Sequence, residues 1–381
     1  MRAPKRKFSD FRCFYTAGLR IINHQNIYVL RDQETAEFRY APIVAVFMAG
    51  LAKFSENNAD TLWFSLNFIL LVSCFWLLGK IVFRETLPFK QRLAVYFFTF
   101  LGISRFIFIN FDTGQTNILV MASIISGIYF IQKNKPIPAG ALLGFSAMIK
   151  YTPLIFIPYF FFRRKFRLLA IMLISIFVYL WLPSLAIGLK QNFYYLKGLP
   201  VFLRQSTIFD QMTILDPKNQ SLLSMWQRFF TSCVAYFHAP AMPFERLNAS
   251  PMTIQLVYLF SALGLYAAAL VKSRREDHPL EDYCLLAICV ALFNLNAWVH
   301  NYILLALPYF VILYYLVKRG FRDRVVAILL VISFMLNFVT AGAFWSEKTA
   351  YKLYFYSPFA LSALAAFLAL IKVKFLPKPQ I

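Results

Sequence analysis

The chain carries a carboxylate, Asp10, directly before a run of residues that favours a helix with one apolar face. A carboxylate in this position commonly caps the helix by accepting hydrogen bonds from its free backbone amides. The same group can act as a general base that removes a proton from an acceptor hydroxyl. The two roles are compatible, and we expect Asp10 to act as such a base at a membrane surface.

A polar turn, Asp112-Thr113-Gly114-Gln115-Thr116-Asn117, separates two apolar runs. Asp and Gly have their usual roles in turns, which accounts for part of this segment. Free amides at the start of the next helix would also favour a phosphate or a sugar, so Asp112, Gln115 and Asn117 are candidate sugar ligands. Arg105 lies inside the preceding apolar run, where a charge needs a partner, and Asp112 is a candidate.

Lys150 is a cation between two short apolar runs and stands three residues before Pro153. It either extends along apolar surface to reach the membrane interface or binds an exposed phosphate oxygen, for which a compact ammonium is suited. We favour the second role, in which the phosphate belongs to a lipid.

Two further polar groups interrupt apolar surroundings. Asn219-Gln220-Ser221-Leu222 precedes an apolar run that contains Arg228, and an N-cap explains Ser221 but not the cation. Asn296-Ala297-Trp298-Val299-His300-Asn301 contains a tryptophan that fits an aromatic belt and a histidine that is more often structural or interfacial at a membrane surface. Convergence of these residues on one face would indicate a site.

Composition indicates a membrane protein. Hydrophobic residues make up 60% of the 381 residues, whereas a soluble domain is nearer half apolar. The formal net charge of +22 would suggest nucleic acid in a soluble protein. In a membrane protein, Lys and Arg instead gather in cytoplasmic loops and face anionic lipid, so we expect a bilayer and no nucleic acid as partner.

The apolar runs predict an all-α polytopic membrane protein with about 11 spans. Two basic clusters, Lys133–Lys135 and Arg163–Arg167, fall on one side only if the chain breaks near Lys150–Pro153 into two half-spans. The expected spans are 60–83, 93–110, 114–131, 137–149, 152–162, 167–189, 251–271, 281–299, 301–317, 324–345 and 355–373.

The basic loops then define the cytoplasmic side, which also holds the C-terminus. The opposite side receives a first outer loop, 8–54, with interfacial helices over 11–23 and 40–54, and a long outer segment, 190–250. Within that segment, 222–237 is either a re-entrant helix or a further span. The basic residues of Met1–Lys7 depart from this topology because it leaves them outside.

The sequence shows no motif for a metal site, a nucleotide site or a pair of catalytic carboxylates. The five cysteines show neither metal spacing nor a disulfide framework, and we find no nucleotide-binding loop, so we expect no metal and no cofactor. A pair of catalytic carboxylates, as glycosidases use, is also not evident. A transferase with a sugar phosphate donor needs only one carboxylate, because cations can stabilise the leaving phosphate.

An ordered series of motifs resembles glycosyltransferase family 87, the polyprenol-phosphate-sugar-dependent, mannosyltransferase type of the GT-C fold. The motifs run in family order over about residues 9–310. They are Asp10-Phe11 with Tyr15-Thr16-Ala17-Gly18, Asn26-Ile27-Tyr28, Tyr40-Ala41-Pro42, Gly114-Gln115-Thr116-Asn117, Gly144 to Pro153, Arg163 to Arg167, Asn219-Gln220-Ser221-Leu222 and Trp298-Val299-His300.

The resemblance implies a single GT-C-like membrane domain, 1–381, whose extracytoplasmic site opens to the lipid. The family's acidic residue maps onto Asp10, and Lys150 and His300 map onto positions assigned to the donor phosphate, to which we add Arg228. Gln115, Asn117, Asp112, Gln220 and Trp298 are expected to bind donor or acceptor sugar. The chain has His300-Asn301 where the family suggests two histidines, and the family-typical span before Asp10 is expected to be missing.

The predicted function is inverting transfer of a hexosyl unit, with mannose the expected sugar. The donor is a polyprenyl phosphate sugar, and the acceptor is a lipid or a cell-envelope glycan at the outer face of a bacterial inner membrane. The alternative is a transporter or flippase of a lipid-linked sugar, which would also contain broken helices and buried charges. An inactive structural homologue is a third alternative.

Overall fold

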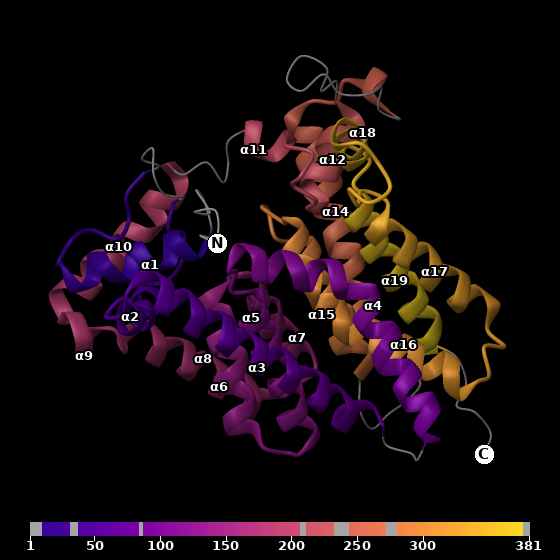
Figure 1. The fold of residues 1–381 in the computed structure, drawn as a ribbon, viewed down its shortest axis with the longest axis horizontal. Coiled ribbons are helices and arrows are strands. Elements are labelled where there is room, and N and C mark those ends of the chain that lie inside the picture. The colour runs from indigo at the N-terminus through magenta and orange to yellow at the C-terminus, as the bar shows by residue number, and fades with distance from the viewer. Residues whose placement is uncertain are drawn as a thin grey trace. The chain divides into compact units, whose positions relative to one another are not determined.

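The computed structural model describes residues 10–30, 37–83, 87–205, 211–231, 244–271 and 280–375, and every regular element in these ranges is a helix (Figure 1). The basic stretch Met1–Lys7 lies outside the described residues, as do parts of the predicted outer segments 8–54 and 190–250. The all-α prediction is therefore confirmed for the described part of the chain.

The helices follow one another along the described part of the chain. In order they are α1 (Asp10–Ile22), α2 (Pro42–Leu51), α3 (Glu56–Val82), α4 (Phe89–Thr113), α5 (Asn117–Gln132), α6 (Pro136–Ile149), η1 (Thr152–Ile155), α7 (Phe156–Phe162), α8 (Phe166–Trp181), α9 (Ser184–Ile187), α10 (Leu189–Gln205), α11 (Gln211–Leu215), α12 (Leu222–Phe230), η3 (Glu245–Leu247), α14 (Pro251–Leu270), α15 (Leu280–Leu292), η4 (Val299–Leu305), α16 (Ala306–Lys318), α17 (Arg324–Phe338), α18 (Glu347–Tyr354) and α19 (Pro358–Phe375).

Six of the described helices are long and apolar enough to cross a bilayer, so the chain is a membrane protein. They are Glu56–Val82, Phe89–Thr113, Phe166–Ile187, Pro251–Leu270, Val299–Lys318 and Pro358–Phe375. Shorter helices occupy the other predicted spans, and the count of about 11 stays a prediction.

Two predicted spans end earlier than expected. The helix predicted over 281–299 stops at Leu292, and the Asn294 side chain beyond it accepts a hydrogen bond from the Asn296 backbone N–H in a local turn. The helix predicted over 324–345 stops at Phe338 and gives way to a turn. Within 222–237, α12 ends at Phe230, and residues 232–237 lie outside the described part of the chain.

The predicted break between two half-spans is confirmed. Helix α6 ends at Ile149, Lys150 is extended with φ −137° and ψ 136°, and η1 begins at Thr152. Pro153 accounts for the break, because proline has no backbone N–H to donate to the Ile149 carbonyl four residues earlier and its ring would clash with that carbonyl. Lys150 is therefore the C-cap of α6: its backbone N–H donates to the Ser146 carbonyl at 3.0 Å, and its extended conformation ends the helix.

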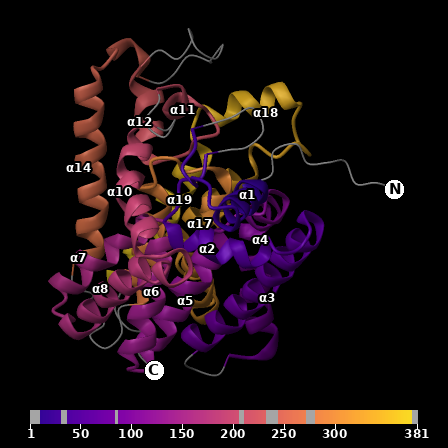
Figure 2. The ribbon, with the colours of Figure 1, turned by 90° about the vertical axis from the view of Figure 1, so that its left-hand side faces the viewer.

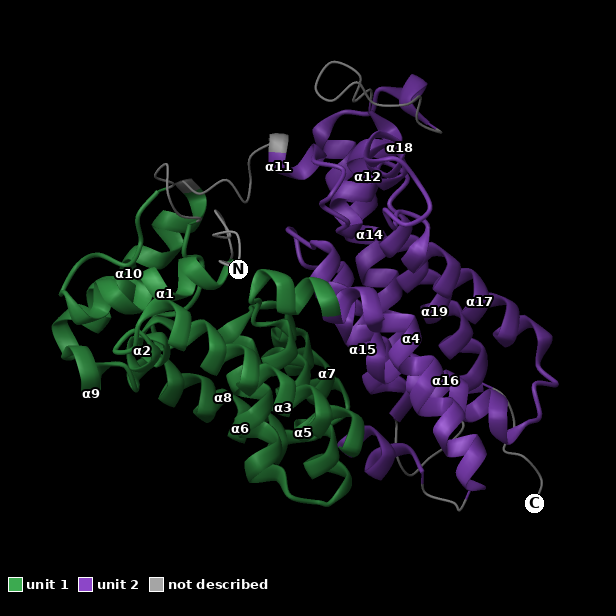
Figure 3. Cartoon of the chain, viewed as in Figure 1, with its two compact units in different colours: residues 1–76, 108–209 green, residues 77–107, 210–381 purple. Residues whose placement is uncertain are grey.

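The chain forms two compact units (Figure 3): the first comprises residues 1–76 and 108–209, and the second comprises 77–107 and 210–381. The single domain over 1–381 stays a prediction. In the first unit α1 packs on α2, α5 on α6, and α6 on α8 (Figure 2). A Cβ at Gly18 would lie 2.6 Å from a backbone atom of Met48, so glycine is what allows α1 and α2 to approach.

In the second unit α15, α16 and α17 pack around α19 and bury polar side chains between them. Tyr309, Ser333, Ser362 and Asn337 form one hydrogen-bonded network. A fully buried ion pair joins Lys374 Nζ to Asp282 at 2.7 Å, and the same ammonium donates to two carbonyls of α14. These bonds satisfy polar groups that lipid cannot solvate.

Candidate functional site

Asp10 is the first residue of the amphipathic helix α1. Phe11, Phe14, Ala17 and Ile21 recur at three- and four-residue spacing and are buried, which holds the helix against the first unit. Asp10 itself is partly buried as a residue. The packing of its neighbours therefore fixes the position of its carboxylate.

The turn between α4 and α5 is built against α1. Gly114 has φ +67°, and a Cβ at this residue would lie 2.6 Å from the Cβ of Phe11, so both the backbone conformation and the close approach call for glycine. The Trp63 indole donates to the Gly114 carbonyl at 2.8 Å. The next residue, Gln115, is thereby held beside the start of α1.

Gln115 and Asp10 are in direct contact. The Gln115 Nε2 donates to Asp10 Oδ2 at 2.6 Å. Burial raises the pKa of Asp10, while this hydrogen bond and the charge of Lys150 act in the opposite direction. A carboxylate with a raised pKa is a stronger base than an exposed one, and its fixed orientation suits proton abstraction.

The cation lies on the other side of the same turn. Lys150 Nζ donates to Asn117 Oδ1 at 2.5 Å, and Asn117 Nδ2 donates to Asn110 Oδ1 at 3.0 Å. Burial lowers the pKa of Lys150 to about 7, and the negative charge of Asp10 opposes this shift. The site thus pairs a base, Asp10, with the Lys150 amine, which can gain or lose a proton near neutral pH.

Four residues predicted from the sequence are brought together in the first unit: Asp10, Gln115, Asn117 and Lys150. Asp112 is exposed in the last turn of α4. The prediction that Asp112 would pair with Arg105 is wrong. The Arg105 guanidinium donates within the second unit, to Thr340 and Tyr354 side chains and to the carbonyls of Asn337 and Thr340.

Arg228 is fully buried in the second unit and supports its backbone. The guanidinium donates to the carbonyls of Asp216, Asn219 and Phe355 and to the hydroxyls of Ser224 and Ser357. These contacts give Arg228 a structural task that the sequence did not reveal.

Gln220 is also fully buried and forms a bridge in this unit. Its Nε2 donates to the carbonyls of Pro217 and Tyr354, and its Oε1 accepts from the Phe359 amide at 3.2 Å. Trp298 is half-buried just before η4, and His300 is buried within η4.

Asn110 is the residue of this cluster that sequence reasoning missed. It lies in the last turns of α4, is 1% exposed, and contacts Asn117 seven residues later. The signal was an amide side chain inside an otherwise apolar run, of the kind that normally needs a partner.

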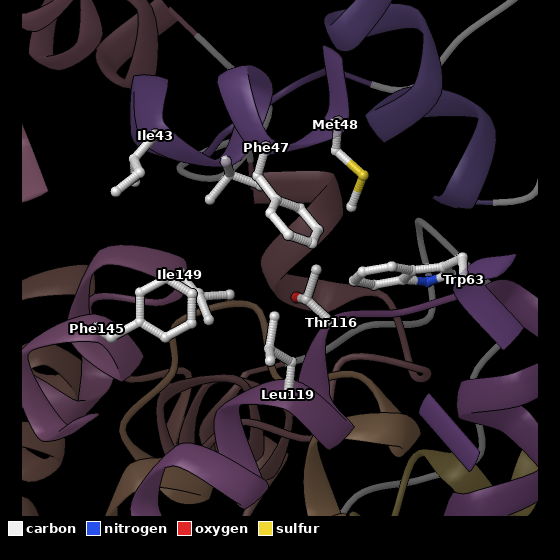
Figure 4. A pocket seen from close by; sticks show the side chains of 9 residues that line it. Ile43, Phe47, Met48, Trp63, Thr116, Leu119, Phe145 and Ile149 are labelled. Carbon is white, nitrogen blue, oxygen red and sulfur yellow. The ribbon is translucent and has the colours of Figure 1, made fainter. Parts of the chain in front are cut away.

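A small apolar pocket lies in the first unit (Figure 4). It is lined by Ile43, Val44, Phe47, Met48, Trp63, Thr116, Leu119, Phe145 and Ile149. Thr116 stands between Gln115 and Asn117 in the chain, and Ile149 directly precedes Lys150. Two residues that line the apolar pocket are therefore direct chain neighbours of residues in the polar cluster. The arrangement suits a ligand with a charged head and a hydrocarbon portion.

A family model matches more than half of the chain. The family model described as glycosyltransferase family 87 matches residues 38–299, which include Gln115, Asn117 and Lys150 but begin after Asp10. No curated protein matches the chain.

Proposed function

Because the chain belongs to glycosyltransferase family 87, we propose that it transfers a hexosyl unit, with mannose the expected sugar, from a polyprenyl phosphate sugar to a lipid or glycan acceptor. Glycosyltransferase activity follows from the family, and the proposal concerns the donor, the sugar and the acceptor. The observation that carries it is that one turn joins the base to the cation: Gln115 binds Asp10, and Asn117 binds Lys150.

In the proposed reaction the Asp10 carboxylate accepts the proton of an acceptor hydroxyl. The acceptor oxygen then forms a bond to the anomeric carbon from the face opposite the phosphate. The bond between that carbon and the phosphate oxygen breaks, its electron pair stays on the phosphate, and the configuration inverts. Among the described residues Gln115 is the hydrogen-bond donor to Asp10, through Oδ2, which leaves Oδ1 for the hydroxyl.

Lys150 is proposed to bind the phosphate of the donor. An ammonium stabilises the negative charge that develops on the leaving group, and this lowers the barrier without a strong acid. His300 remains a proposed phosphate ligand through the family resemblance. We propose structural roles for Arg228 and Gln220, since their side chains hydrogen-bond the buried backbone of the second unit.

The apolar pocket supports a lipid-linked donor. Apolar side chains from α2, α3, α5 and α6 line it, and Ile149 and Thr116 connect it to the phosphate-binding region (Figure 4). A water-soluble nucleotide sugar would gain little from such a surface, whereas the isoprenyl unit next to a phosphate would bury apolar area there. Asp112 and Trp298 stay proposed sugar contacts.

We also propose that the site faces the extracytoplasmic side of a bacterial inner membrane, with the C-terminus in the cytoplasm. The distribution of Lys and Arg supports this, because the basic clusters Arg163–Arg167 and Lys318–Arg324 fall on the side opposite Lys150 in the predicted topology.

The test is reconstitution of the purified chain in liposomes with defined polyprenyl phosphate sugars and candidate acceptors. Mass spectrometry should detect a new glycosidic bond and release of free polyprenyl phosphate. A nucleotide sugar supplied alone should give no product. Movement of the lipid-linked sugar across the bilayer without a new glycosidic bond would favour the transporter alternative over the proposal.

A further inference from the structure

We propose that Asn110 is a positioning residue, which holds the Asn117 carboxamide with its oxygen toward Lys150 and so keeps the ammonium charged and oriented for the donor phosphate. The inference rests on the proposed function, because it assigns to Lys150 the role of phosphate ligand. It adds a residue that neither the sequence motifs nor the family match singled out.

The direction of the hydrogen bonds follows from chemistry. A protonated lysine only donates, so the Asn117 atom at 2.5 Å from Nζ must be the amide oxygen. The amide nitrogen of Asn117 then points the other way and needs an acceptor. Asn110 Oδ1 is that acceptor, 3.0 Å from Asn117 Nδ2. If Asn110 offered no acceptor, Asn117 would lose this reason to keep its oxygen toward the cation.

Asn110 and Asn117 are buried, so losing the hydrogen bond between them should be costly. Asn110 is 1% exposed and Asn117 is 3% exposed, so water is poorly placed to replace a lost bond. Both residues sit at helix ends, near the end of α4 and at the start of α5. The turn between them also positions Gln115, the partner of Asp10, because the Gln115 backbone N–H donates to the Asn110 backbone carbonyl at 3.1 Å.

The charge state of Lys150 is sensitive to this orientation. Burial lowers the pKa of Lys150 to about 7, and the negative charge of Asp10 in α1 opposes this shift. The oxygen of Asn117 stabilises the ammonium further through a charge-assisted hydrogen bond. With the amide turned around, its N–H groups would face the cation and favour the neutral amine.

A purely structural role for Asn110 makes a different prediction. If its bond to Asn117 only ties α4 to α5, then replacements should change stability and leave the pH dependence of the reaction alone. If Asn110 acts through Lys150, then the pH at which activity declines should move with the hydrogen-bonding capacity of residue 110.

The experiment compares Asn110→Leu with Asn110→Asp in the full chain, in liposomes with a polyprenyl phosphate sugar. Leucine has a similar size and no acceptor, so the alkaline limb of kcat/KM should move about one unit to lower pH. Aspartate keeps an acceptor for Asn117 and adds negative charge, so the limb should stay or move to higher pH. Asn67→Leu is the matched control, since Asn67 is buried in α3 and donates to Trp63 O of its own helix.

An alkaline limb that moves to lower pH in the leucine variant, and that stays or moves to higher pH in the aspartate variant, supports the inference. An unchanged alkaline limb in both variants overturns it, and Asn110→Ala serves as a second truncation should the leucine variant fail to fold. Donor binding by Lys150→Met separates this inference from the proposed function. If that variant binds donor as tightly as the wild type, then Lys150 is not a phosphate ligand and both fail. If it binds donor weakly while the Asn110 variants keep the wild-type limb, then only the role of Asn110 fails.

Discussion

Gln115 Nε2 lies 2.6 Å from Asp10 Oδ2, and this contact joins residues that are 105 positions apart in the chain. Two positions beyond Gln115, Asn117 accepts from Lys150. The turn between α4 and α5 therefore sets the spacing between the base and the cation. Gly114 makes the turn possible through its positive φ and its close approach to Phe11.

Replacement of Asp10 by Asn should remove the base while preserving shape. We expect kcat to fall about 10³-fold, in the range typical of general-base catalysis. Binding of the donor should change little, because Lys150 is left in place. Product formation in liposomes measures the first quantity, and titration with a polyprenyl phosphate sugar measures the second. Asp60→Asn is the control, since Asp60 is exposed on α3 of the same unit.

Replacement of Gln115 by Met should shift the acidic limb of activity. The hydrogen bond from Gln115 lowers the pKa of Asp10 against the effect of burial, so its loss should raise that pKa further. The base works only when deprotonated, and the acidic limb of kcat/KM should therefore move to higher pH. Gln132→Met, at the end of α5, should leave the limb unmoved. A limb that stays in place in Gln115→Met would contradict the assigned contact.

Much of the fold follows from local sequence rules. Apolar length located the helices, and proline together with the basic clusters located the break at Lys150, which the structure confirms. Helix ends were harder to locate, because an apolar run does not show where a side chain caps its own turn. The local bond of Asn294 to the Asn296 amide, which goes with the end of α15 at Leu292, has no signature in hydropathy.

The candidate site was partly visible in the sequence. Asp10, Gln115, Asn117 and Lys150 stood out because polar residues are rare in this chain, yet nothing in their spacing joined Gln115 to Asp10. Because charged residues are rare in apolar runs, Arg228 was also predicted to bind the donor phosphate. In the structure its guanidinium donates to backbone carbonyls. A sequence gives the chemical type of a residue, whereas its role depends on partners contributed by distant segments.

Replacement of Lys150 by Arg should change the alkaline side of the pH profile. The pKa of Lys150 is lowered to about 7 by burial, so the wild-type ammonium is charged below that pH and is lost as pH rises through it. Wild-type kcat/KM should therefore decline above about pH 7. A guanidinium stays charged, so Lys150→Arg should have a lower maximum but a flat profile to about pH 9. Lys197→Arg, exposed on α10, should retain the wild-type decline.

Replacement of Arg228 by Met distinguishes support of the fold from phosphate binding. The guanidinium is fully buried and donates to three carbonyls and two hydroxyls. Each buried acceptor left without a donor costs about 1–3 kcal/mol, so the variant should unfold at a clearly lower temperature in detergent. The protein that remains folded should bind donor as the wild type does. Arg322→Met, exposed in the same unit, controls for loss of positive charge. A variant with wild-type thermal stability and a raised KM for the donor would instead indicate that Arg228 binds the donor phosphate.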